Sequence, residues 1–413
     1  MHICIFQTGE PIHIDEGDYR PMRAISLTNK LIKNGHKVTL ITSSFFHQRK
    51  KFRSKKTKKI KVNKFLDIIL IKSPGYKKHI GLKRIIDHIY LALNLKNYLE
   101  ENRDFKPNRV FIGYPPIETS LILVLWAKKF NIPTIIDIKD NWPVNFIDPF
   151  PIILKPIVKI IISPYFFISK YVFRKSNAIS SISKEFIDWI KEFSKEPNKK
   201  YIITPLIREP IEISSSENQK AINFWNKKNI DILASKHFSF VGSLTNSFDF
   251  NFIFKSAEFL IKEYPEYSFI ICGSGDQYKD LKLKSLIFKN IRVLGEINKF
   301  QAKTLIKNSI ATIAPYRNTI NFQKSVPNKV IESLENGTPF ITNLDGKLKN
   351  MIDRYENGIY IPEHNKKFLS QYINLIKDHT YRDKLSKNAS RSFEKLFNFD
   401  RAYDRLNEEI LRI

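Results

Sequence analysis

Short apolar runs alternate with longer amphipathic segments along the first half of the chain. The apolar runs are typical of buried strands, and the segments between them repeat their apolar residues at helical spacing. The pattern predicts helices over residues 20–34, 82–101, 117–130 and 184–193, and strands over residues 2–6, 37–42, 67–72, 109–112, 133–138, 177–182 and 201–204. This alternation predicts right-handed βαβ units and a parallel sheet.

The same alternation returns in the second half. It predicts strands over residues 238–241, 267–272, 291–294, 310–314 and 340–342, helices over residues 248–263, 299–307 and 326–336, and two or three further helices within residues 366–413. The predicted fold class is therefore α/β, with two Rossmann-like, doubly wound parallel-sheet domains. Ligands of such sheets bind beyond the carboxyl ends of the strands, so we expect the two domains to face a central cleft.

The predicted domain boundaries follow from where the alternation stops. Residues 1–204 form an N-terminal domain and residues 237–395 a C-terminal domain. Residues 205–236 are predicted to be a linker, because residues 214–218 are small and polar, with a short helix over residues 219–228. Residues 396–413 are expected to form a helix that crosses back to the N-terminal domain.

The chain is strongly basic, with a formal net charge of +28 over 413 residues. Ten Lys and Arg residues and no acid lie between residues 49 and 64. Such a run is typical of a solvated loop, and it could also contact anionic lipid head groups. A basic nucleic-acid-binding module is a further interpretation. Because the other basic residues are spread through the chain, we predict no nucleic-acid partner.

Few residues suit disulfide, metal or membrane-spanning roles. Cys4 and Cys272 lie in apolar runs and are predicted core thiols. The sequence has no Asp-x-Asp and no His/Cys cluster, so we predict no metal and no cofactor. Neither a secretory signal nor a spanning helix is evident, which favours a cytoplasmic protein. Residues 151–175 are interpreted either as a buried helical pair, which we favour, or as an interfacial surface beside a lipid-linked acceptor.

The segment from Ser325 to Pro339 carries the clearest chemical signal. Ser325 can cap a helix, Pro327 suits its first turn, and Gly337 ends it. Lys329 and Glu332 are three positions apart and therefore share a face. Lys329 and the helix N-terminus could hold a diphosphate, and Glu332 could accept hydrogen bonds from ribose hydroxyls. The alternative is an exposed ion pair, although lysine before glutamate is the less favoured order along a helix.

This segment resembles the donor-binding helix of retaining GT-B glycosyltransferases of family four, which carry Pro-x-Lys-x-x-Glu at this place. The order of the neighbouring motifs is similar as well: residues 34–42 (NGHKVTLIT), 240–244 (FVGSL), 271–275 (ICGSG), 293–296 (VLGE) and 314–316 (APY). Residues 137–143 (DIKDNWP) resemble the branch that transfers N-acetylated amino sugars in surface-polysaccharide assembly, such as that of lipopolysaccharide or capsule. The resemblance covers nearly the whole chain and implies the GT-B fold, retention of configuration and no metal.

The chain departs from the family pattern near the donor phosphates. Lys324 stands eight residues before Glu332, where many members have a glutamate. Ser243 and Phe248 stand near the positions of an Arg and a Lys that many members use for phosphate. These departures leave the donor sugar more open than the reaction class. The phosphate charge is then left to Lys329, the helix N-terminus, and Arg317 or Lys324.

Other candidate residues lie where predicted strands end. Asp140 could contact the donor sugar or the acceptor, or form an ordinary turn. The adjoining Lys139, which stands where some relatives have a histidine, is a predicted acceptor ligand. Arg20 and Arg23 could meet an anionic acceptor or lie on a solvated helix face. The remaining predicted donor ligands, each with a turn as the alternative, are Asn328, Gly17, Gly273, Gly275, Gly295 and Glu296.

The predicted function is glycosyl transfer from a nucleotide diphosphate sugar, UDP-linked, to a sugar hydroxyl of a glycan or lipid-linked acceptor. Asp140 and Lys329 are the predicted catalytic residues. An anionic membrane surface is a further expected contact, with the protein peripheral on the inner face of the cell membrane. The alternatives are a sugar-nucleotide epimerase of the same architecture and the basic nucleic-acid-binding module.

Overall fold

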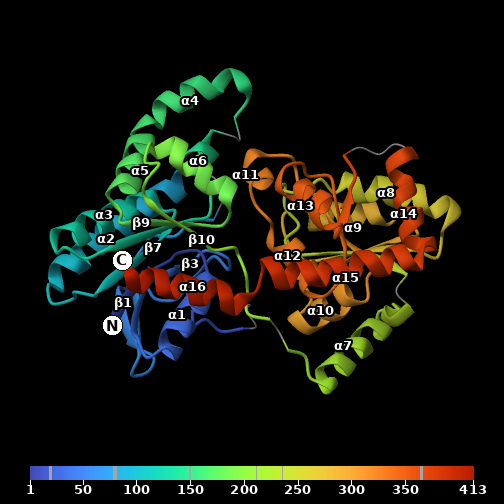
Figure 1. Ribbon diagram of the computed structural model, residues 1–413, viewed down its shortest axis with the longest axis horizontal. Helices are drawn as coiled ribbons and strands as arrows, with labels where there is room; N and C mark the ends of the chain where they lie inside the picture. Colours follow the sequence, from blue (N-terminus) through green and yellow to red (C-terminus); the bar gives the residue numbers. More distant parts are fainter. Residues whose placement is uncertain (18–20, 78–80, 148–149, 211, 235, 363–365) are drawn as a thin grey trace. The chain divides into compact units, whose positions relative to one another are not determined.

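The computed structural model describes the chain except residues 18–20, 78–80, 148–149, 211, 235 and 363–365. The chain divides into two compact units (Figure 1). The first contains Met1–Glu209 and Phe399–Ile413, and the second contains Pro210–Asn398. The division therefore falls at Glu209 and Pro210, inside the stretch that the sequence predicts as a linker.

The first unit is built on a mainly parallel sheet. Among the described residues its eight strands run in the order β10-β9-β8-β7-β1-β2-β6-β5, and only β5 is antiparallel to its neighbour. The strands are β1 (His2–Phe6), β2 (Lys37–Ser43), β5 (Lys58–Lys61), β6 (Leu66–Ile71), β7 (Arg109–Tyr114), β8 (Thr134–Ile138), β9 (Ala178–Ser181) and β10 (Lys200–Ile203).

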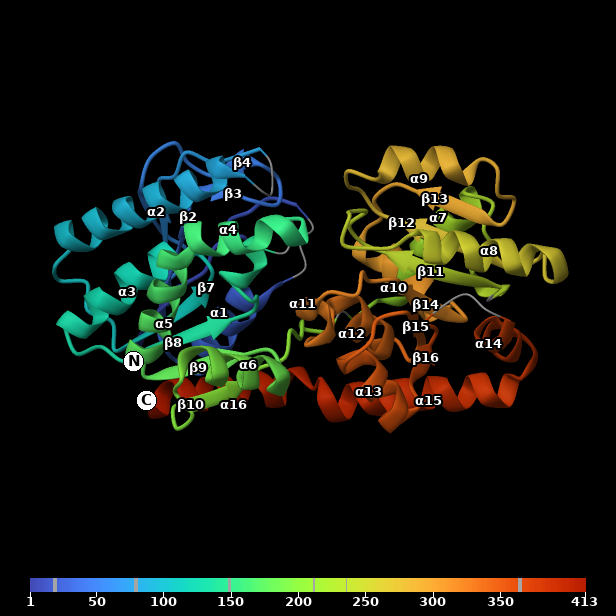
Figure 2. The same cartoon turned by 90° about the horizontal axis from the view of Figure 1, so that it is seen from above.

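Alternate residues of these strands enter two separate cores, because successive side chains point to opposite faces of a sheet. Ile3 and Ile5 of β1 pack with α1 (Arg23–Lys33) and α16 (Phe399–Arg412). Cys4 and Phe6 pack on the other face, with α2 (Leu82–Glu101), α3 (Ile117–Lys129), α5 (Ser163–Lys175) and α6 (Lys184–Ser194) (Figures 1 and 2). Burial on both faces explains the continuous apolar runs of the sequence.

The basic segment is folded rather than a simple solvated loop. It contains β4 (Lys51–Phe52), which pairs with β3 (Phe45–Phe46), and the edge strand β5. Lysines on an edge strand discourage pairing with another chain. Arg53 is buried in an ion pair with Asp15 at 2.6 Å, and it donates to the Glu10 carbonyl at 3.0 Å. One arginine of this segment therefore holds the loop that follows β1.

The second unit has a fully parallel sheet. Within the described residues its order is β13-β12-β11-β14-β15-β16. The strands are β11 (His237–Val241), β12 (Ser268–Cys272), β13 (Ile291–Leu294), β14 (Ala311–Ala314), β15 (Phe340–Thr342) and β16 (Gly358–Tyr360). The helices are α7 (Ser215–Lys227), α8 (Asn251–Glu263), α9 (Tyr278–Ser285), α10 (Lys299–Lys307), α11 (Ile320–Gln323), α12 (Asn328–Glu335), α13 (Lys347–Tyr355), α14 (Lys366–Lys377) and α15 (His379–Leu396).

Helices cover both faces of the second sheet. Ile270 and Cys272 of β12 pack with Trp225 of α7 and Leu305 of α10. Phe269 on the opposite face stacks with Phe238 at 5.2 Å, and Phe238 also contacts Tyr372 of α14. Because Trp225 is fully buried, α7 is part of this domain, although the sequence analysis placed it in a linker.

Residues 151–175 differ from the buried helical pair favoured by the sequence. The segment forms η2 (Ile152–Leu154), α4 (Lys155–Ile161) and α5, and no residue of η2 or α4 is buried. Within the described residues, no single helix is long and apolar enough to cross a membrane. Two consecutive helical segments, Ile152–Ile161 and Ser163–Lys175, are together long and apolar enough to span a membrane by length and composition. They are bent relative to each other by 62°.

Candidate active site

The carboxyl end of β11 and the start of α12 form the first part of the candidate site. Lys329, in the first turn of α12, donates to the Val241 carbonyl at 2.7 Å. Its ammonium lies 4.7 Å from the ring centre of Phe240 and 5.1 Å from that of Phe248. The side chain therefore reaches from the helix to the end of the central strand, which is where ligands of such sheets bind.

Gly242 makes this approach possible. A side chain there would collide with the Lys329 ammonium, and the residue has φ +145°, which L side chains rarely adopt. Gly273 follows β12 and lies against the Gly242 carbonyl, and Gly275 lies against Leu244 in the same way. Gly273 and Gly275, two of the predicted donor ligands, thus allow backbone segments to approach closely at the strand ends.

The rest of α12 is anchored to the sheet. The Thr312 hydroxyl of β14 donates to the Ser333 hydroxyl at 2.7 Å, which in turn donates to the Thr338 carbonyl at 2.7 Å. Gly337 has φ +66° just after the helix, so the prediction that it ends α12 is confirmed. The predicted cap is wrong. Ser325 donates to the Asn321 carbonyl instead, and Pro327 precedes a helix that no side chain caps.

An uncapped helix start leaves room for an anion, because the first N–H groups of a helix have no partner inside it. Asn328 is the first residue of α12, and its Oδ1 is buried without a hydrogen-bond partner among the described residues. Glu332 lies one turn further along, half-buried. Burial, followed by the negative charge of Glu332, raises the pKa of the neighbouring Tyr316. Asn328, Lys329 and Glu332 therefore lie in the first two turns of one helix.

The other predicted donor residues lie around this centre or apart from it. Glu296 is exposed and accepts a hydrogen bond from Ser274 at 2.5 Å, so the loops after β12 and β13 are joined. Gly295 is exposed, and a side chain there would meet nothing within 4 Å. Arg317 lines a small hollow of about 150 Å³ with Phe248 and Lys284. Gly17 is exposed in the first unit with φ +110°.

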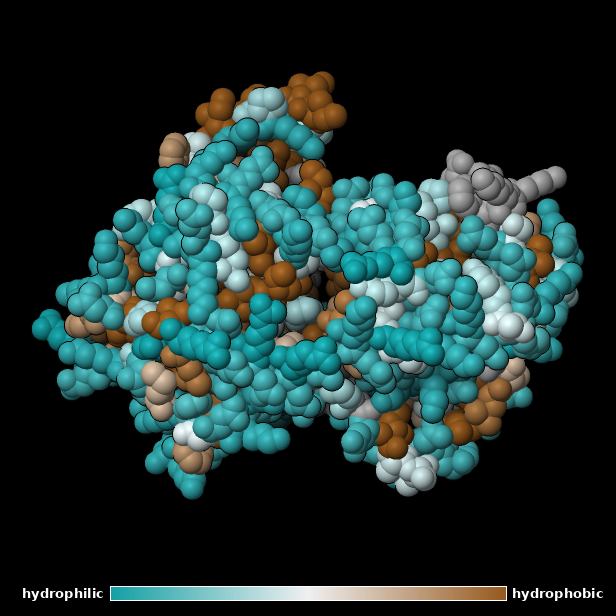
Figure 3. Space-filling model, in the orientation of Figure 1, coloured by the Kyte–Doolittle hydropathy of each residue, from teal (hydrophilic) through white to brown (hydrophobic). Residues whose placement is uncertain are grey.

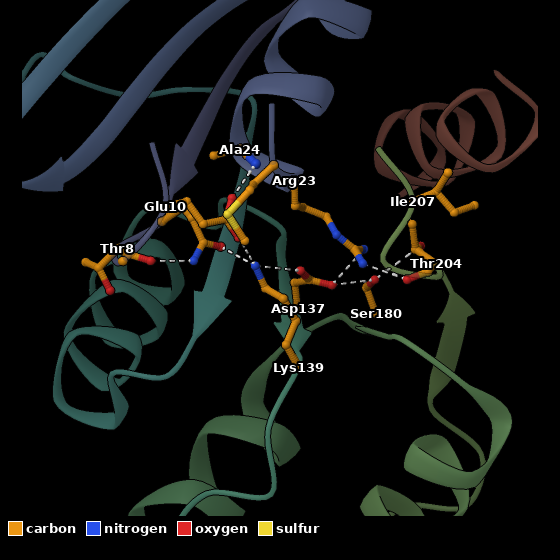
Figure 4. Close-up of polar contacts among 12 residues, drawn as sticks. Thr8, Glu10, Arg23, Ala24, Asp137, Lys139, Ser180, Thr204 and Ile207 are labelled. Carbon is orange, nitrogen blue, oxygen red and sulfur yellow. Dashed lines mark hydrogen bonds and ion pairs between the residues drawn. The ribbon is translucent and has the colours of Figure 1, made fainter. Parts of the chain in front are cut away.

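The strand ends of the first unit hold a buried charge network (Figure 4). Arg23 pairs with Asp137 at 3.2 Å and donates to the Thr204 carbonyl at 2.7 Å. Lys139 pairs with Glu10 at 2.5 Å and lies 3.8 Å from Asp137. Two cations thus meet two carboxylates, so the charges of Lys139 and Arg23 are compensated inside the protein.

This network explains how α1 is placed. Glu10 accepts a hydrogen bond from the Ala24 backbone N–H at 2.8 Å, at the start of α1. Arg23 is 3% exposed. Its side chain therefore does not lie on the solvated helix face that the sequence analysis considered, and it binds the β8 and β10 ends of the sheet instead. Arg20, its predicted companion, lies outside the described residues.

A pocket of about 280 Å³ lies within the first unit beside this network. Asp140 and Lys139 line it, so these two predicted residues are brought together. Trp142, which follows them, is 8% exposed and packs against Phe146, so it belongs to the core. The other polar and aromatic lining residues include Gln7, Glu10, His47, Tyr76, Arg84, Asp87 and His88.

The wall formed by α2 carries a mixed set of titratable groups. The Arg84 guanidinium lies 4.9 Å from the Trp142 ring and 5.8 Å from the Tyr76 ring. Burial, and then the charge of Arg84, lowers the pKa of His88 to about 3. Burial raises the pKa of Asp87, which accepts a hydrogen bond from the Gly75 N–H at 2.6 Å. The wall therefore presents a neutral imidazole and a cation over an aromatic surface.

Three site residues escaped the sequence analysis. Glu10, Gly242 and Arg84 were not predicted as functional. Glu10 and Gly242 each follow a predicted central strand, and this position alone is a usable signal in a doubly wound fold. Arg84 is one of many basic residues along the chain, and no local pattern singles it out.

Comparison with known proteins decides the domain class of the second unit. Residues 221–392 match the family model described as Glycosyl transferases group 1. The match covers less than half of the chain and lies within the second unit. The matched range contains β11, α12 and the Gly242–Lys329 contact described above. No curated protein matches the sequence of this chain.

Solved structures share the architecture of the whole chain. Sucrose-phosphate synthase from Thermosynechococcus elongatus has a TM-score of 0.72 at 12% identity, covering 100% of this chain and 98% of its own. The HepE protein of Anabaena in complex with UDP-glucose has a TM-score of 0.62 at 10% identity, with 100% of both chains covered. WaaG, a glycosyltransferase involved in lipopolysaccharide biosynthesis, has a TM-score of 0.61 at 12% identity and 99% coverage of both chains.

These similarities establish the GT-B fold, as predicted: two Rossmann-like α/β domains with parallel sheets. The match of residues 221–392 to the glycosyl transferases group 1 model supports a glycosyltransferase. At identities of 10–12%, similarity to these structures shows the fold alone. The donor, the acceptor and the stereochemistry therefore have to be argued from the residues.

Proposed function

We propose that the protein transfers a glycosyl group from a UDP-linked sugar to a sugar hydroxyl of a glycan or lipid-linked acceptor. The observation that carries the proposal is the Lys329 ammonium, which α12 and Gly242 together hold at the end of β11. A fixed cation beside an uncapped helix start suits a diphosphate, since both interact favourably with negative charge.

The donor is proposed to lie along the first turns of α12. Lys329 and the helix start would contact the diphosphate, and Glu332 would accept hydrogen bonds from ribose hydroxyls. The buried Oδ1 of Asn328 offers one further acceptor. Arg317, Gly295 and Glu296 are proposed to contribute from the surrounding loops, near the base or the phosphates.

The difficult step in such a transfer is departure of the diphosphate, on which negative charge develops as the glycosidic bond breaks. A lysine that is already in place stabilises that charge without reorganisation. We therefore keep Lys329 as a catalytic residue. Retention of configuration is also proposed, on the resemblance of residues 325–339 to the donor-binding helix of retaining GT-B glycosyltransferases. An N-acetylated amino sugar is proposed on the resemblance of residues 137–143 to amino-sugar transferases.

The acceptor is proposed to bind in the pocket of the first unit. Asp140 lines that pocket and could contact the reacting hydroxyl. Aromatic and charged groups that line the pocket, such as Tyr76 and Arg84, suit a sugar ring with an anionic substituent. Because its charge is matched by Glu10, we assign Lys139 to positioning of the pocket wall and not to capture of an anion.

A panel of UDP-, GDP- and ADP-linked sugars tests the proposal by thermal shift. We expect UDP-sugars at about 100 times the dissociation constant to stabilise the protein by about 2.7 kcal/mol. Glu332→Ala should abolish this shift without changing the melting temperature of the free protein. Lys303→Ala is the matched control, since Lys303 of α10 pairs at 3.8 Å with Glu335, the last residue of α12.

Two outcomes would overturn the proposal. One is the absence of stabilisation by every sugar nucleotide while DNA stabilises the protein, which would favour a basic binding module. The other is conversion of a UDP-sugar into its epimer without release of UDP, as observed by NMR. That result would assign the site to an epimerase.

A further inference from the structure

The surface of η2 and α4 is unusually apolar. Ile152 and Ile153 are 81% and 83% exposed, and Ile160 and Ile161 of α4 are 73% and 71% exposed. Such side chains are ordinarily buried, because water contact with apolar area is unfavourable. Figure 3 shows the resulting hydrophobic surface at the upper edge of the molecule, where Figure 1 draws α4.

The exposed isoleucines form one stripe. Ile157, Ile160 and Ile161 are spaced three and four residues apart, so they share a helix face. Ile153 lies one turn before Ile157 in sequence, on the adjoining η2. Contiguous exposed apolar surface of this kind marks a site of interaction and not a feature of the core.

The sequence segment that carries the stripe has charges of a single sign. The sequence from residue 149 to residue 184 contains six Lys and Arg residues and no Asp or Glu. Lys159 is exposed on α4 itself, and Arg174 and Lys175 are exposed at the end of α5. Apolar residues flanked by cations fit an anionic lipid surface, where the apolar groups enter the interface and the cations meet head groups.

The next helix holds α4 in place. Tyr165 of α5 donates to Glu118 at 2.8 Å, and Phe173 packs against Tyr114 at 5.1 Å between ring centres. Val172 and Phe173 are fully buried. These contacts tie α5 to the sheet of the first unit, so α4 is presented on a rigid base and can lie on a bilayer without crossing it.

We propose that η2 and α4 dock on an anionic lipid bilayer, with the isoleucine stripe in the interface and Lys155 and Lys159 at the head-group phosphates. The proposal extends the proposed function by placing the acceptor pocket, which belongs to the same unit, beside a membrane that would carry a lipid-linked acceptor. Only the link to a lipid-linked acceptor rests on the proposed function, because docking on lipid itself needs no sugar donor.

Sedimentation of the full chain with vesicles tests the docking. The vesicles are phosphatidylcholine alone, or phosphatidylcholine with about 30% phosphatidylglycerol. We expect at least tenfold tighter binding to the anionic vesicles, and at least a tenfold loss for Ile160→Gln with Ile161→Gln. A charge reversal, Lys155→Glu with Lys159→Glu, should give a similar loss that is confined to anionic vesicles.

The second unit supplies a matched control. Leu286 and Ile287 are 74% and 79% exposed, and Leu286→Gln with Ile287→Gln removes the same amount of apolar character elsewhere. This variant should bind vesicles as the unaltered protein does. UDP stabilisation is measured on every preparation, so that loss of fold or failure of the proposed donor site is seen separately from loss of docking.

Equal vesicle binding by the Ile160→Gln, Ile161→Gln variant and the unaltered protein would overturn the proposal. So would a concentration-dependent dimer that this variant abolishes in the absence of any vesicle binding, because the stripe would then be covered by a second copy of the chain. Equal binding to neutral and anionic vesicles would contradict the assigned role of the lysines.

Discussion

The two sheets end in contrasting ways at the edge where ligands of this fold bind. In the first unit, Arg23 and Lys139 meet Asp137 and Glu10 in a buried network. In the second unit, Lys329 meets a backbone carbonyl and the faces of two phenylalanines beside an uncapped helix. The first arrangement fixes a wall of the pocket, and the second is the proposed site of the donor diphosphate.

The difference teaches that a charged residue at a strand end is not by itself a ligand-binding residue. Lys139 and Lys329 both follow or approach a central strand of a Rossmann-like sheet. Lys139 is held by the carboxylates of Glu10 and Asp137, which compensate the cost of burying its charge. Lys329 is held at the end of β11 through the Val241 carbonyl. Variants that disturb one end and spare the other can test this contrast.

The largest effect is expected from breaking the buried network. Asp137→Asn leaves the Arg23 guanidinium without its carboxylate in a site where Asp137 is fully buried and Arg23 is 3% exposed. We expect the free energy of unfolding to fall by about 3–5 kcal/mol, because an uncompensated buried charge remains. Urea denaturation measures this loss. A change below about 1 kcal/mol would show that the network is solvated and weak.

A steric change at the second strand end should act on binding more than on folding. Gly242→Ala places a Cβ against the Lys329 ammonium at φ +145°. We expect backbone strain of about 1–3 kcal/mol and a loss of UDP affinity of about tenfold or more, as the lysine is displaced. Gly81→Ala is the matched control, because Gly81 has a similar φ of +146° and a side chain there meets nothing within 4 Å. Unchanged UDP binding by Gly242→Ala would separate Lys329 from the donor.

Acid should weaken both units through their buried histidines. Burial lowers the pKa of His88 to about 3 and that of His237 to about 4. The unfolded chain binds these protons near pH 6.5 and the folded chain does not, so stability falls as the pH drops below 6.5. Each histidine contributes a slope of up to about 1.4 kcal/mol per pH unit until its folded pKa is reached.

His88→Gln tests the part of this slope that belongs to the pocket wall. We expect the free energy of unfolding of the variant to depend less steeply on pH between 6 and 4, while His237→Gln removes the corresponding part from the second unit. Denaturation curves at pH 7, 6, 5 and 4 supply the measurement. An unaltered slope for His88→Gln would mean that this imidazole is protonated in the folded protein.

The smallest change in the free energy of unfolding is expected at an exposed ion pair. It serves as the reference for the loss expected in the buried network. Lys96 and Glu100 lie 3.8 Å apart on α2 with side chains 53% and 62% exposed. Glu100→Gln should change the free energy of unfolding by no more than about 0.5 kcal/mol, because water and salt screen such pairs. A loss comparable to that of Asp137→Asn would remove the distinction between buried and exposed charges.

The sequence predicted the repeated βαβ pattern well, because both sheets are buried on two faces and their strands read as apolar runs. It missed β4 and β5, where lysines cover a short edge strand and hide the strand pattern. It also favoured a buried pair for residues 151–175, since the apolar content of a segment does not say whether the surrounding fold covers it. That outcome is fixed only by how α5 packs on the sheet.

The site was predictable in part for similar reasons. The helix that carries Lys329 and Glu332 follows from the sequence pattern, and the structure forms it as α12. Arg23 and Lys139 are held inside the protein by Asp137 and Glu10. Because Glu10 and Lys139 are far apart in the sequence, no local pattern predicts that they pair. Long-range partners of this kind decide whether a cation binds a ligand or stabilises the fold.

The contrast between the two lysines is tested most directly by calorimetric titration of UDP into the unaltered protein, Lys329→Met and Lys139→Met. The melting temperature first shows that each preparation is folded. If Lys139→Met does not fold, Gln7→Leu replaces it, because Gln7 accepts a hydrogen bond from Lys139. The account predicts a loss of UDP affinity of about 10- to 100-fold for Lys329→Met and an unchanged affinity for the first-unit variant. Full affinity in Lys329→Met, or a loss confined to Lys139→Met or Gln7→Leu, would contradict it.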